Sequence, residues 1–325
     1  MRETSREKVY IGIDVGSVSV NLAVVGEDGR LLKKRYIRTN GAPINAVKTA
    51  LTESREELER LYTVAGAATT GSGRHLIGHL IGADEIKNEI TAHAVAATHY
   101  YDDVSTVIEI GGQDSKIIII ENNVVVDFAM NTICAAGTGS FLDQQSQRLG
   151  IDISEFGDYA LKSVLPTKIA GRCGVFAESD MIHKQQIGYQ KHDIIAGLCF
   201  ALVNNYLNNV GRGKKIKDKI VFQGGVAANR GIIKAFGETL GKKIYVAEHY
   251  DVMGAIGAAL IAMKSRRGRA EKSRYKGASC FDSDISSDAF ECGACSNACE
   301  IISVTKDGKR LFNIGGRCGR YDYKD

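Results

Sequence analysis

Two acidic residues at matching places in the chain have the surroundings of a phosphate and metal site. Asp14 and Glu109 each end an apolar stretch, in IDVGS and IEIGGQD, and stand two positions before a glycine. Such turns direct backbone N–H groups into a concavity that holds phosphate oxygens, and a nearby carboxylate can hold Mg²⁺ through its bound waters. One such turn is as often only a tight turn, but two in register are a much stronger signal. The residues expected to be catalytic are Asp14, Gln113 and Asp114, with Asp14 and Asp114 also holding Mg²⁺, and those expected to bind the phosphates are Gly16, Ser17, Val18, Ser19, Gly112, Gln113 and Lys116.

A third glycine cluster, FQGGVAANRG at residues 222–231, follows a strand-like run and precedes a helical one. Gly224 and Gly225 allow close approach of the backbone to a flat ligand. Asn229 can bond to a base or a ribose. We expect these residues and Val226 to bind the nucleoside part of a nucleotide. The alternative is a strand-to-helix turn in which Asn229 bonds only to the protein.

The stretch NTICAAGTGSFLDQQSQRLG, residues 131–150, combines one cysteine with a glycine-rich turn and a helical pattern. It is not a P-loop, because no Gly-Lys-Ser/Thr follows, and it is not a zinc knuckle, because no second cysteine lies nearby. Gly137 and Thr138, where the helix begins, are expected to contact a nucleotide. A second cysteine, Cys173, lies in a similar glycine-flanked turn 39 positions after Cys134.

The end of the chain is rich in cysteine. Residues 280–325 hold five of the eight cysteines, and ECGACSNACEI has the spacing Cys-x2-Cys-x3-Cys. The stretch IISVTKDGKRLFNI predicts a β-hairpin around Asp307-Gly308, which would bring the two ends of the tail together. Cys280 is left outside the set, because polar and acidic residues separate it from Cys292, although it could replace Cys318. The predicted ligands of one metal centre, for which zinc and an iron–sulfur cluster are both chemically open, are Cys292, Cys295, Cys299 and Cys318.

Two longer segments that carry the acidic turns follow the same plan. Residues 9–37 read as a β-meander of apolar strands and polar turns, and residues 107–130 repeat it. Asp14-Val15-Gly16 aligns with Glu109-Ile110-Gly111, 95 positions later. Helical patterns follow each meander, so the repeat predicts two similar α/β lobes that face each other. The expected organisation is a two-lobed domain at 1–263, with lobes at about 1–100 and 101–263, a basic linker at 264–279 and a cysteine-rich tail at 280–325.

Composition and charge indicate the class of protein and the compartment and partners to expect. Of its 325 residues, 44% are hydrophobic and 25% charged, as in a globular protein with a large core. The charged N-terminus argues against a secretory signal, and the apolar run at 252–263 is too short to span a bilayer, so we expect a cytoplasmic protein with no membrane partner. Its eight cysteines would then stay mostly reduced, which favours metal or redox chemistry over disulfides. The net charge is +4, but no aromatic residues are interleaved with the basic ones, so we expect no nucleic-acid partner. The basic linker is expected to be a solvated segment, and the alternative is that it forms a docking patch for an acidic partner.

The three glycine loops IGIDVGS, IEIGGQDSK and FQGGVAANRG resemble the acetate and sugar kinase, heat-shock chaperone and actin superfamily. Within it, the Cys134 stretch and IAGRCGVFAESDMI resemble the ATP-dependent activators of 2-hydroxyacyl-CoA dehydratases. These belong to the BadF/BadG/BcrA/BcrD ATPase family, with benzoyl-CoA reductase ATPase subunits and the reductases of double-cubane cluster proteins. The resemblance covers roughly residues 8–263 and implies an α/β fold, a duplicated two-lobed actin-like ATPase, here with a short cysteine-rich extension.

This resemblance also implies cofactors. It implies ATP or ADP with Mg²⁺, and a [4Fe–4S] cluster held by Cys134 and Cys173. Such a cluster usually takes four thiolates, and Cys199 lies in an apolar helical run where it is expected to be buried packing. A twofold homodimer would double the two ligands to four. Many relatives have Lys where the first loop here has Asn21, which makes Lys116 the candidate donor to the terminal phosphate.

The expected function is an ATPase coupled to electron transfer. Nucleotide-driven movement of the lobes would change the surroundings of the cluster. Ferredoxin or flavodoxin would donate electrons, and an iron–sulfur dehydratase or reductase, of the 2-hydroxyacyl-CoA dehydratase or double-cubane type, would accept them. The alternative is a small-molecule, sugar-type kinase, and a third reading is a chaperone-like or regulatory ATPase. Cys134 and Cys173 argue against a kinase, and the tail, which minimal activators lack, favours a reductase partner other than a simple dehydratase.

Overall fold

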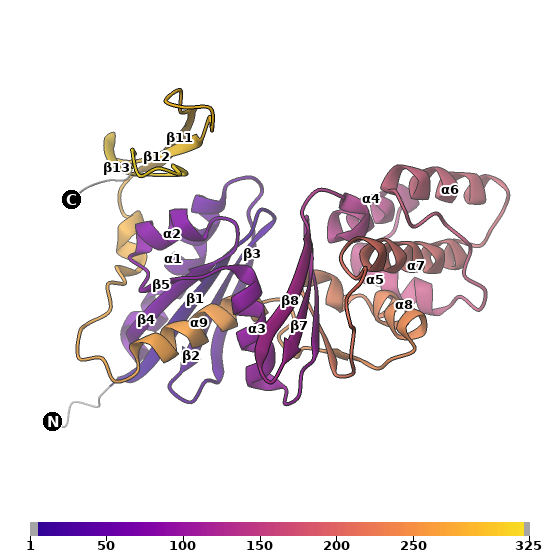
Figure 1. Cartoon of the computed structure of the whole chain (residues 1–325), viewed down its shortest axis with the longest axis horizontal. Coiled ribbons are helices and arrows are strands. Elements are labelled where there is room, and N and C mark those ends of the chain that lie inside the picture. The colour runs from indigo at the N-terminus through magenta and orange to yellow at the C-terminus, as the bar shows by residue number, and fades with distance from the viewer. Residues whose placement is uncertain (1–5, 322–325) are drawn as a thin grey trace.

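The computed structural model describes residues 6–321 as two α/β lobes side by side, with the C-terminal tail against the outer helices of the first lobe (Figure 1). The first lobe is built on a five-stranded sheet in the order β3-β2-β1-β4-β5. In it β1 pairs antiparallel with β2 and parallel with β4. The strands are β1 (Glu7–Val15), β2 (Ser19–Gly26), β3 (Leu31–Arg38), β4 (Tyr62–Thr70) and β5 (Glu85–Ile86).

Helices cover both faces of this first sheet. α1 (Pro43–Leu61) and α2 (Arg74–Ile81) pack on one face, and α9 (Met253–Arg266) packs on the other. As a result Ile11 joins the core under α1 and α2, whereas its neighbour Tyr10 joins the core under α9. Burial on both faces explains why β1 is an almost continuous apolar run.

The second lobe repeats this topology. Its sheet has the order β8-β7-β6-β9-β10, with β6 antiparallel to β7 and parallel to β9, as β1 is to β2 and β4. Asn122 and Asn123 both have positive φ in the tight turn between β7 and β8. The predicted duplicated, two-lobed fold is therefore confirmed. The strands are β6 (Thr106–Ile110), β7 (Ser115–Glu121), β8 (Val124–Asn131), β9 (Ile220–Gln223) and β10 (Ile244–Val246).

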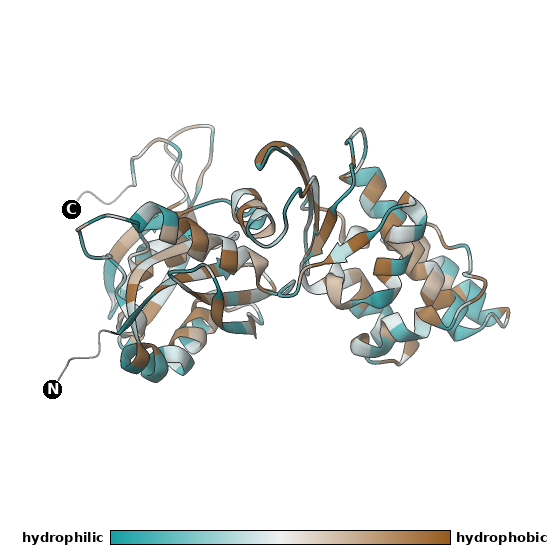
Figure 2. Ribbon diagram, turned by 90° about the horizontal axis from the view of Figure 1, so that it is seen from below, coloured by the Kyte–Doolittle hydropathy of each residue, from teal (hydrophilic) through white to brown (hydrophobic). Residues whose placement is uncertain are grey.

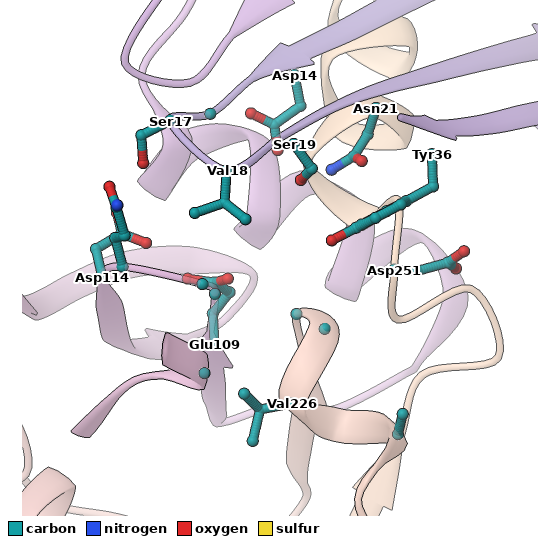
Figure 3. Close-up of a pocket in the computed structure, with 18 of the residues that line it drawn as sticks. Asp14, Ser17, Val18, Ser19, Asn21, Tyr36, Glu109, Asp114, Val226 and Asp251 are labelled. Carbon is teal, nitrogen blue, oxygen red and sulfur yellow. The ribbon is translucent and has the colours of Figure 1, made fainter. Parts of the chain in front are cut away.

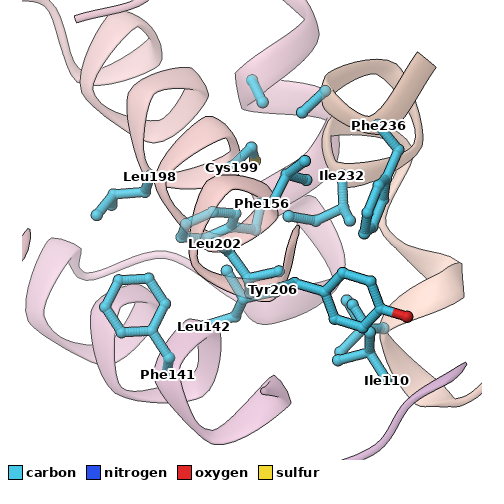
Figure 4. Close-up of a cluster of buried hydrophobic side chains, with 14 of the residues drawn as sticks. Ile110, Phe141, Leu142, Phe156, Leu198, Cys199, Leu202, Tyr206, Ile232 and Phe236 are labelled. Atoms are coloured by element: carbon cyan, nitrogen blue, oxygen red, sulfur yellow. The ribbon is translucent and has the colours of Figure 1, made fainter. Parts of the chain in front are cut away.

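The outer face of the second sheet packs against helices around one large apolar core (Figure 4). Tyr206 is fully buried in it, and its hydroxyl donates a 2.8 Å hydrogen bond to the carbonyl oxygen of Lys116. Cys199 is 1% exposed in the same core, and burial raises its pKa to about 12, as expected of a packing thiol. The helical elements are η1 (Ala135–Gly137), α4 (Gly139–Leu149), α5 (Ile153–Leu161), α6 (Gly174–Gln186), α7 (Lys191–Asn209), η2 (Gly225–Ala228) and α8 (Arg230–Leu240).

Two helices join the lobes. α3 (Glu89–Tyr100) contacts α9 and the second sheet, while α9 contacts the first sheet, and one apolar cluster includes residues of both sheets. A Cβ on Gly12 of β1 would lie 1.8 Å from the carbonyl oxygen of Ala255, so only glycine allows α9 to approach this closely. The expected lobe boundary assigned α9 to the second lobe by sequence position; its packing is with the first.

The tail forms its own three-stranded sheet, in the order β11-β12-β13. It is attached to the outside of the first lobe: Arg55 of α1 pairs with Asp282 at 3.2 Å, and the ring of His79 in α2 lies 5.4 Å from that of Phe312. The turn between β12 and β13 is at Asp307 and Gly308, both with positive φ, so the predicted hairpin is confirmed. The elements are η3 (Gly277–Phe281), β11 (Ile285–Glu291), β12 (Glu300–Lys306) and β13 (Lys309–Ile314).

The view from below shows the same two lobes, with apolar segments distributed over both (Figure 2). Within residues 6–321, every helix is too short or too polar to cross a lipid bilayer.

Candidate functional site

A cavity of about 560 Å³ lies between the two lobes (Figure 3). Its size is in the range of small-molecule sites. In Figure 3, Asp14, Val18 and Ser19 of the first lobe face Glu109 and Val226 of the second. Of the residues predicted from the sequence to act on or bind a nucleotide, those that line the cavity are Asp14, Gly16, Ser17, Val18, Ser19, Gly112, Gln113, Asp114, Lys116, Gly224, Gly225, Val226 and Asn229.

The two acidic turns form matching loops at this cavity. The N–H of Gly16 donates to the carbonyl oxygen of Ser19 at 2.9 Å, and the N–H of Gly111 donates to that of Asp114 at 3.0 Å. The loops also meet each other, because a Cβ on Gly112 would lie 2.7 Å from Cγ2 of Val18. The internal repeat therefore places two equivalent turns against each other across the interface of the lobes.

The third glycine cluster forms another wall. Gly224 has a φ of +86°, and a Cβ there would lie 2.3 Å from the carbonyl oxygen of Ile110, so this turn requires glycine. Asn229 lines the cavity, but its Oδ1 also accepts from the N–H of Ile232 at 3.1 Å as the N-cap of α8. The oxygen of Asn229 therefore caps the helix, as the structural alternative expects, and its binding of a nucleoside stays a prediction.

Asp14 lies at the end of β1 beside the start of α9. A Cβ on Gly254 would lie 2.1 Å from its carboxylate and 3.2 Å from Nε2 of His93. Burial raises the pKa of Asp14 to about 6, an effect opposed by the nearby His93. His93 in turn pairs with Gln223 through Nδ1 and Oε1 at 2.7 Å. His93, whose charge acts on Asp14 of the first lobe, is thus itself bonded to Gln223 at the end of β9 in the second.

Lys116 is held by three carboxylates. Its Nζ lies 2.7 Å from Glu89, 2.9 Å from Glu109 and 2.8 Å from Asp114, and its side chain is 2% exposed. Burial alone would lower the pKa of Lys116, but the carboxylates outweigh it and hold that pKa above the usual range. Burial raises the pKa of Glu109. Excess negative charge around one ammonium suits a further cation in this cavity.

Several residues that line the cavity were not predicted from the sequence. Tyr36, Glu89, His93 and Asp251 also line it. Oδ1 of Asn21, another lining residue, is buried and has no hydrogen-bond partner among the residues that the structure describes. An unsatisfied buried acceptor at a cavity is suited to a ligand donor. A nucleotide with its metal therefore fits the polar atoms that the cavity offers.

Two ion pairs link the lobes next to the cavity, and Arg38, Asp143 and Asp251 line it. Lys34 of β3 lies 2.8 Å from Asp251, and Arg38 of the same strand lies 4.0 Å from Asp143 of α4. The first joins β3 to the segment between β10 and α9, and the second joins β3 to α4 of the second lobe. Sequence reasoning missed all four residues, because a surface charge shows no preference for a partner far along the chain.

Gly137 and Thr138 do not line the cavity. Gly137 faces the side chain of Asn205, and the fully buried Thr138 donates its hydroxyl to the carbonyl oxygen of Ala135 at 2.8 Å. The short η1 turn takes both inward. Their neighbours reach the site instead: Gly139 lines it, and the N–H groups of Gly139 and Ser140 donate to the carbonyl oxygens of Gly111 and Gly112 at 2.9 and 2.8 Å.

Cys134 and Cys173 are half-buried free thiols in adjoining turns of the second lobe. Cys134 precedes η1 and Cys173 precedes α6, and a Cβ on Gly174 would lie 3.6 Å from that of Ala136. Two thiols from one chain fit half of a four-thiolate cluster. A four-thiolate cluster at this position would need two further ligands.

The tail cysteines lie apart from the cavity between the lobes and from Cys134 and Cys173. In the part of the chain from 6 to 321, no three His, Cys, Asp or Glu side chains already form a metal-binding group. The four tail thiols therefore do not form such a group, and the tail metal centre stays a prediction.

Known proteins match the chain over its two lobes. The model of the BadF/BadG/BcrA/BcrD ATPase family matches residues 11–262. The (R)-2-hydroxyglutaryl-CoA dehydratase activating ATPase of Acidaminococcus fermentans is 34% identical over 78% of this chain and 96% of that protein. The 2-hydroxyisocaproyl-CoA dehydratase activator of Clostridioides difficile is 32% identical over 78% of this chain and 94% of its own length.

A solved structure agrees. The crystal structure of component A of the A. fermentans dehydratase has a TM-score of 0.72 and 33% identity, and covers 79% of this chain and 98% of that one. The two-lobed actin-like ATPase fold and the family resemblance seen in the sequence are both confirmed. The chain belongs to the BadF/BadG/BcrA/BcrD ATPase family.

Proposed function

We propose that this chain is an ATP-hydrolysing iron–sulfur electron-transfer protein that drives low-potential electrons into a partner dehydratase or reductase. The family and the named activators support the ATP-dependent part. They favour this reading over a sugar-type kinase. Electron transfer, the cluster and the partners rest on the arguments below.

The observation that carries the proposal is the attachment of α4 to the cavity. α4 begins five residues after Cys134, and its first two N–H groups and the hydroxyl of Ser140 all bond to the loop of Gly111 and Gly112. A change in that loop on nucleotide binding or hydrolysis would therefore act directly on the segment that holds Cys134. Such a rigid connection lets one site bias the conformation of another.

Roles for the cavity residues follow from their positions. Asp14 and Asp114 are proposed to hold Mg²⁺ and the attacking water, and Gln113 to orient that water. The loops at Gly16 and Gly112 would bind the phosphates, with Ser17 and Ser19 as further donors. Lys116 would reach a phosphate only by exchanging one of its three carboxylate partners for a phosphate oxygen. Magnesium would neutralise the charge that develops on the phosphates. The Gly224 to Asn229 segment would bind the nucleoside.

A homodimer is proposed around Cys134 and Cys173. Apolar side chains next to both cysteines are exposed: Ile133 at 95%, Val175 at 70% and Phe176 at 65%. Side chains of this kind favour burial against another protein surface. A [4Fe–4S] cluster held by four thiolates of two chains would supply a one-electron redox centre. The first turn of α6, after Cys173, would favour its negative charge.

The ion pairs Lys34–Asp251 and Arg38–Asp143 are proposed to form when the lobes close and to break when they open. The pair of Arg38 and Asp143 links β3 to α4, the helix behind Cys134. Opening the lobes would separate this pair. The electron donor is proposed to be ferredoxin or flavodoxin, and the acceptor an iron–sulfur dehydratase or reductase of the 2-hydroxyacyl-CoA dehydratase or double-cubane type.

The test is whether the nucleotide changes access to iron. Protein purified without oxygen is mixed with an iron chelator in the presence of ADP or of a non-hydrolysable ATP analogue, and loss of visible absorbance is timed. We expect rates that differ several-fold between the two nucleotides. Equal rates with iron present would contradict coupling between the cavity and the cysteines.

A further inference from the structure

The sheet of the tail buries too little surface to be stable alone. Six of the seven residues of β11 are exposed, and Ile301 and Val304 are the buried apolar side chains of its three strands. Sheets of about 40 residues usually need a disulfide, a metal or a partner to stay folded. The tail packs on α1 and α2 through η3 and the β12–β13 hairpin, which leaves β11 almost without packing.

Three cysteines lie in one loop at one end of this sheet. β11 and β12 stay paired as far as Glu291 and Glu300. The next residue pair closes the loop, because the N–H of Cys292 donates to the carbonyl oxygen of Cys299 at 2.8 Å. Cys292, Cys295 and Cys299 are therefore held within eight consecutive residues beyond the last strand pair.

The last strand brings Cys318 toward the same end. β13 ends at Ile314, which pairs with Ile302 of β12. Gly315 then lies against Glu300, since a Cβ there would be 2.2 Å from the Glu300 carbonyl oxygen. Further along, the ring of Tyr321 lies 5.4 Å from that of Phe290, at the end of β11. The segment that contains Cys318 therefore crosses the end of the sheet at which the cysteine loop begins.

We propose that Cys292, Cys295, Cys299 and Cys318 bind one structural zinc ion in each chain, and that this ion holds the tail sheet folded. Zinc forms closed tetrahedral sites with four thiolates, and a Cys-x2-Cys pair is a common source of two of them. No three of these thiols within residues 6–321 are preassembled as a metal group, so the ion draws them together and displaces their protons as the sheet closes.

A structural ion suits this location better than a redox centre. The tail contacts α1 and α2 of the first lobe, whereas Cys134 and Cys173 precede η1 and α6 of the second (Figure 1). A relay requires its centres to be close together, and a structural zinc ion has no such requirement. The matched family region also ends at residue 262, before the tail, so the ion would stabilise an addition to the ATPase.

The experiment uses the full chain, purified without oxygen from cells supplied with both zinc and iron. Zinc and iron are measured per chain in the wild type, in Cys295→Ser and in Cys280→Ser. Cys295 is exposed, so its loss removes a ligand and no packing. Cys280 is the matched control, because it lies in the same tail but contacts the carbonyl oxygen of Gly277 at 3.1 Å.

We expect one zinc per chain in the wild type and in Cys280→Ser, and at least about a tenfold loss in Cys295→Ser. Iron should be equal in all three, which separates this result from the fate of the proposed cluster. Trypsin should cut the tail faster in Cys295→Ser, while the ATPase lobes stay intact. Absence of zinc from the wild type, retention of zinc in Cys295→Ser, loss in Cys280→Ser, disulfides among these cysteines, or iron that depends on Cys295 would each overturn the proposal.

Discussion

The hydroxyl of Ser140 donates a 2.6 Å hydrogen bond to the carbonyl oxygen of Gly112. Ser140 stands at the start of α4, six residues after Cys134, and Gly112 belongs to a loop of the cavity between the lobes. The backbone N–H of the same serine bonds to the same oxygen at 2.8 Å. This double contact ties the start of the helix that follows a candidate cluster ligand to a loop of the candidate nucleotide site.

Replacing Ser140 with alanine should weaken that connection without removing the site. One hydrogen bond of about 1 kcal/mol is lost, and the backbone bond remains, so we expect the nucleotide-dependent difference in iron chelation rate to shrink roughly fivefold. ATP binding should be nearly unchanged. The measurement is the ratio of chelation rates with ADP and with the ATP analogue.

Ser146→Ala is the matched control for this variant. Ser146 lies in the same helix, and its hydroxyl bonds to the carbonyl oxygen of Asp143, inside α4. Its loss costs a similar local bond but touches no cavity loop, so the ratio should stay at the wild-type value. If both serine variants lowered the ratio equally, the effect would reflect stability of the helix and not its attachment to Gly112.

Asp14→Asn should lower Mg²⁺-dependent ATP hydrolysis by at least about 100-fold, because it removes a charge proposed to hold metal and water at the γ-phosphate. Affinity for ADP should change little. Steady-state hydrolysis with nucleotide affinity measured in parallel tests this. Near-normal turnover would show that another residue holds the metal and the water, and Asp114→Asn would then be the next variant to measure.

The raised pKa of Asp14 predicts how stability depends on pH. In the folded chain its pKa is about 6, against 3.8 as the ordinary value, so the folded state binds more protons between these pH values. The contribution of Asp14 to the free energy of unfolding is therefore largest at low pH and is lost as the pH rises through about 6. Asp14→Asn, which cannot ionise, should stabilise the nucleotide-free chain at pH 8 by on the order of 1–3 kcal/mol and have little effect near pH 4. Denaturant unfolding at the two pH values checks this; an effect of equal size at both would contradict it.

The fold was predictable where local pattern decides it. Asp14 and Glu109 end apolar strands of equal plan, and the two sheets indeed have one topology. The place of α9 was not predictable, because its small and apolar residues suit either lobe. The first sheet receives it because Gly12 lets Ala255 approach β1.

The candidate site, like the fold, was predictable only in part. Glycine turns at Gly16, Gly112 and Gly224 are local, so their positions at the cavity could be expected. His93 and the pair of Arg38 and Asp143 come together only through the packing of α3 and α4 between distant segments. No periodicity or spacing in the sequence marks such contacts. Thr138 was expected at the nucleotide because it stands where a glycine-rich turn leads into a helix, but its hydroxyl bonds to the carbonyl oxygen of Ala135 in the η1 turn.

The most direct measurement is the iron and acid-labile sulfide content of the protein, purified without oxygen, in the wild type, Cys134→Ser and Cys199→Ala, together with its oligomeric state. Cys199 serves as control because it is 1% exposed within the core of the second lobe. We predict four iron atoms for each wild-type dimer, the same in Cys199→Ala, and none in Cys134→Ser, which should still bind ATP. Four iron atoms on each single chain, or a complete cluster in Cys134→Ser, would contradict a centre shared between two copies.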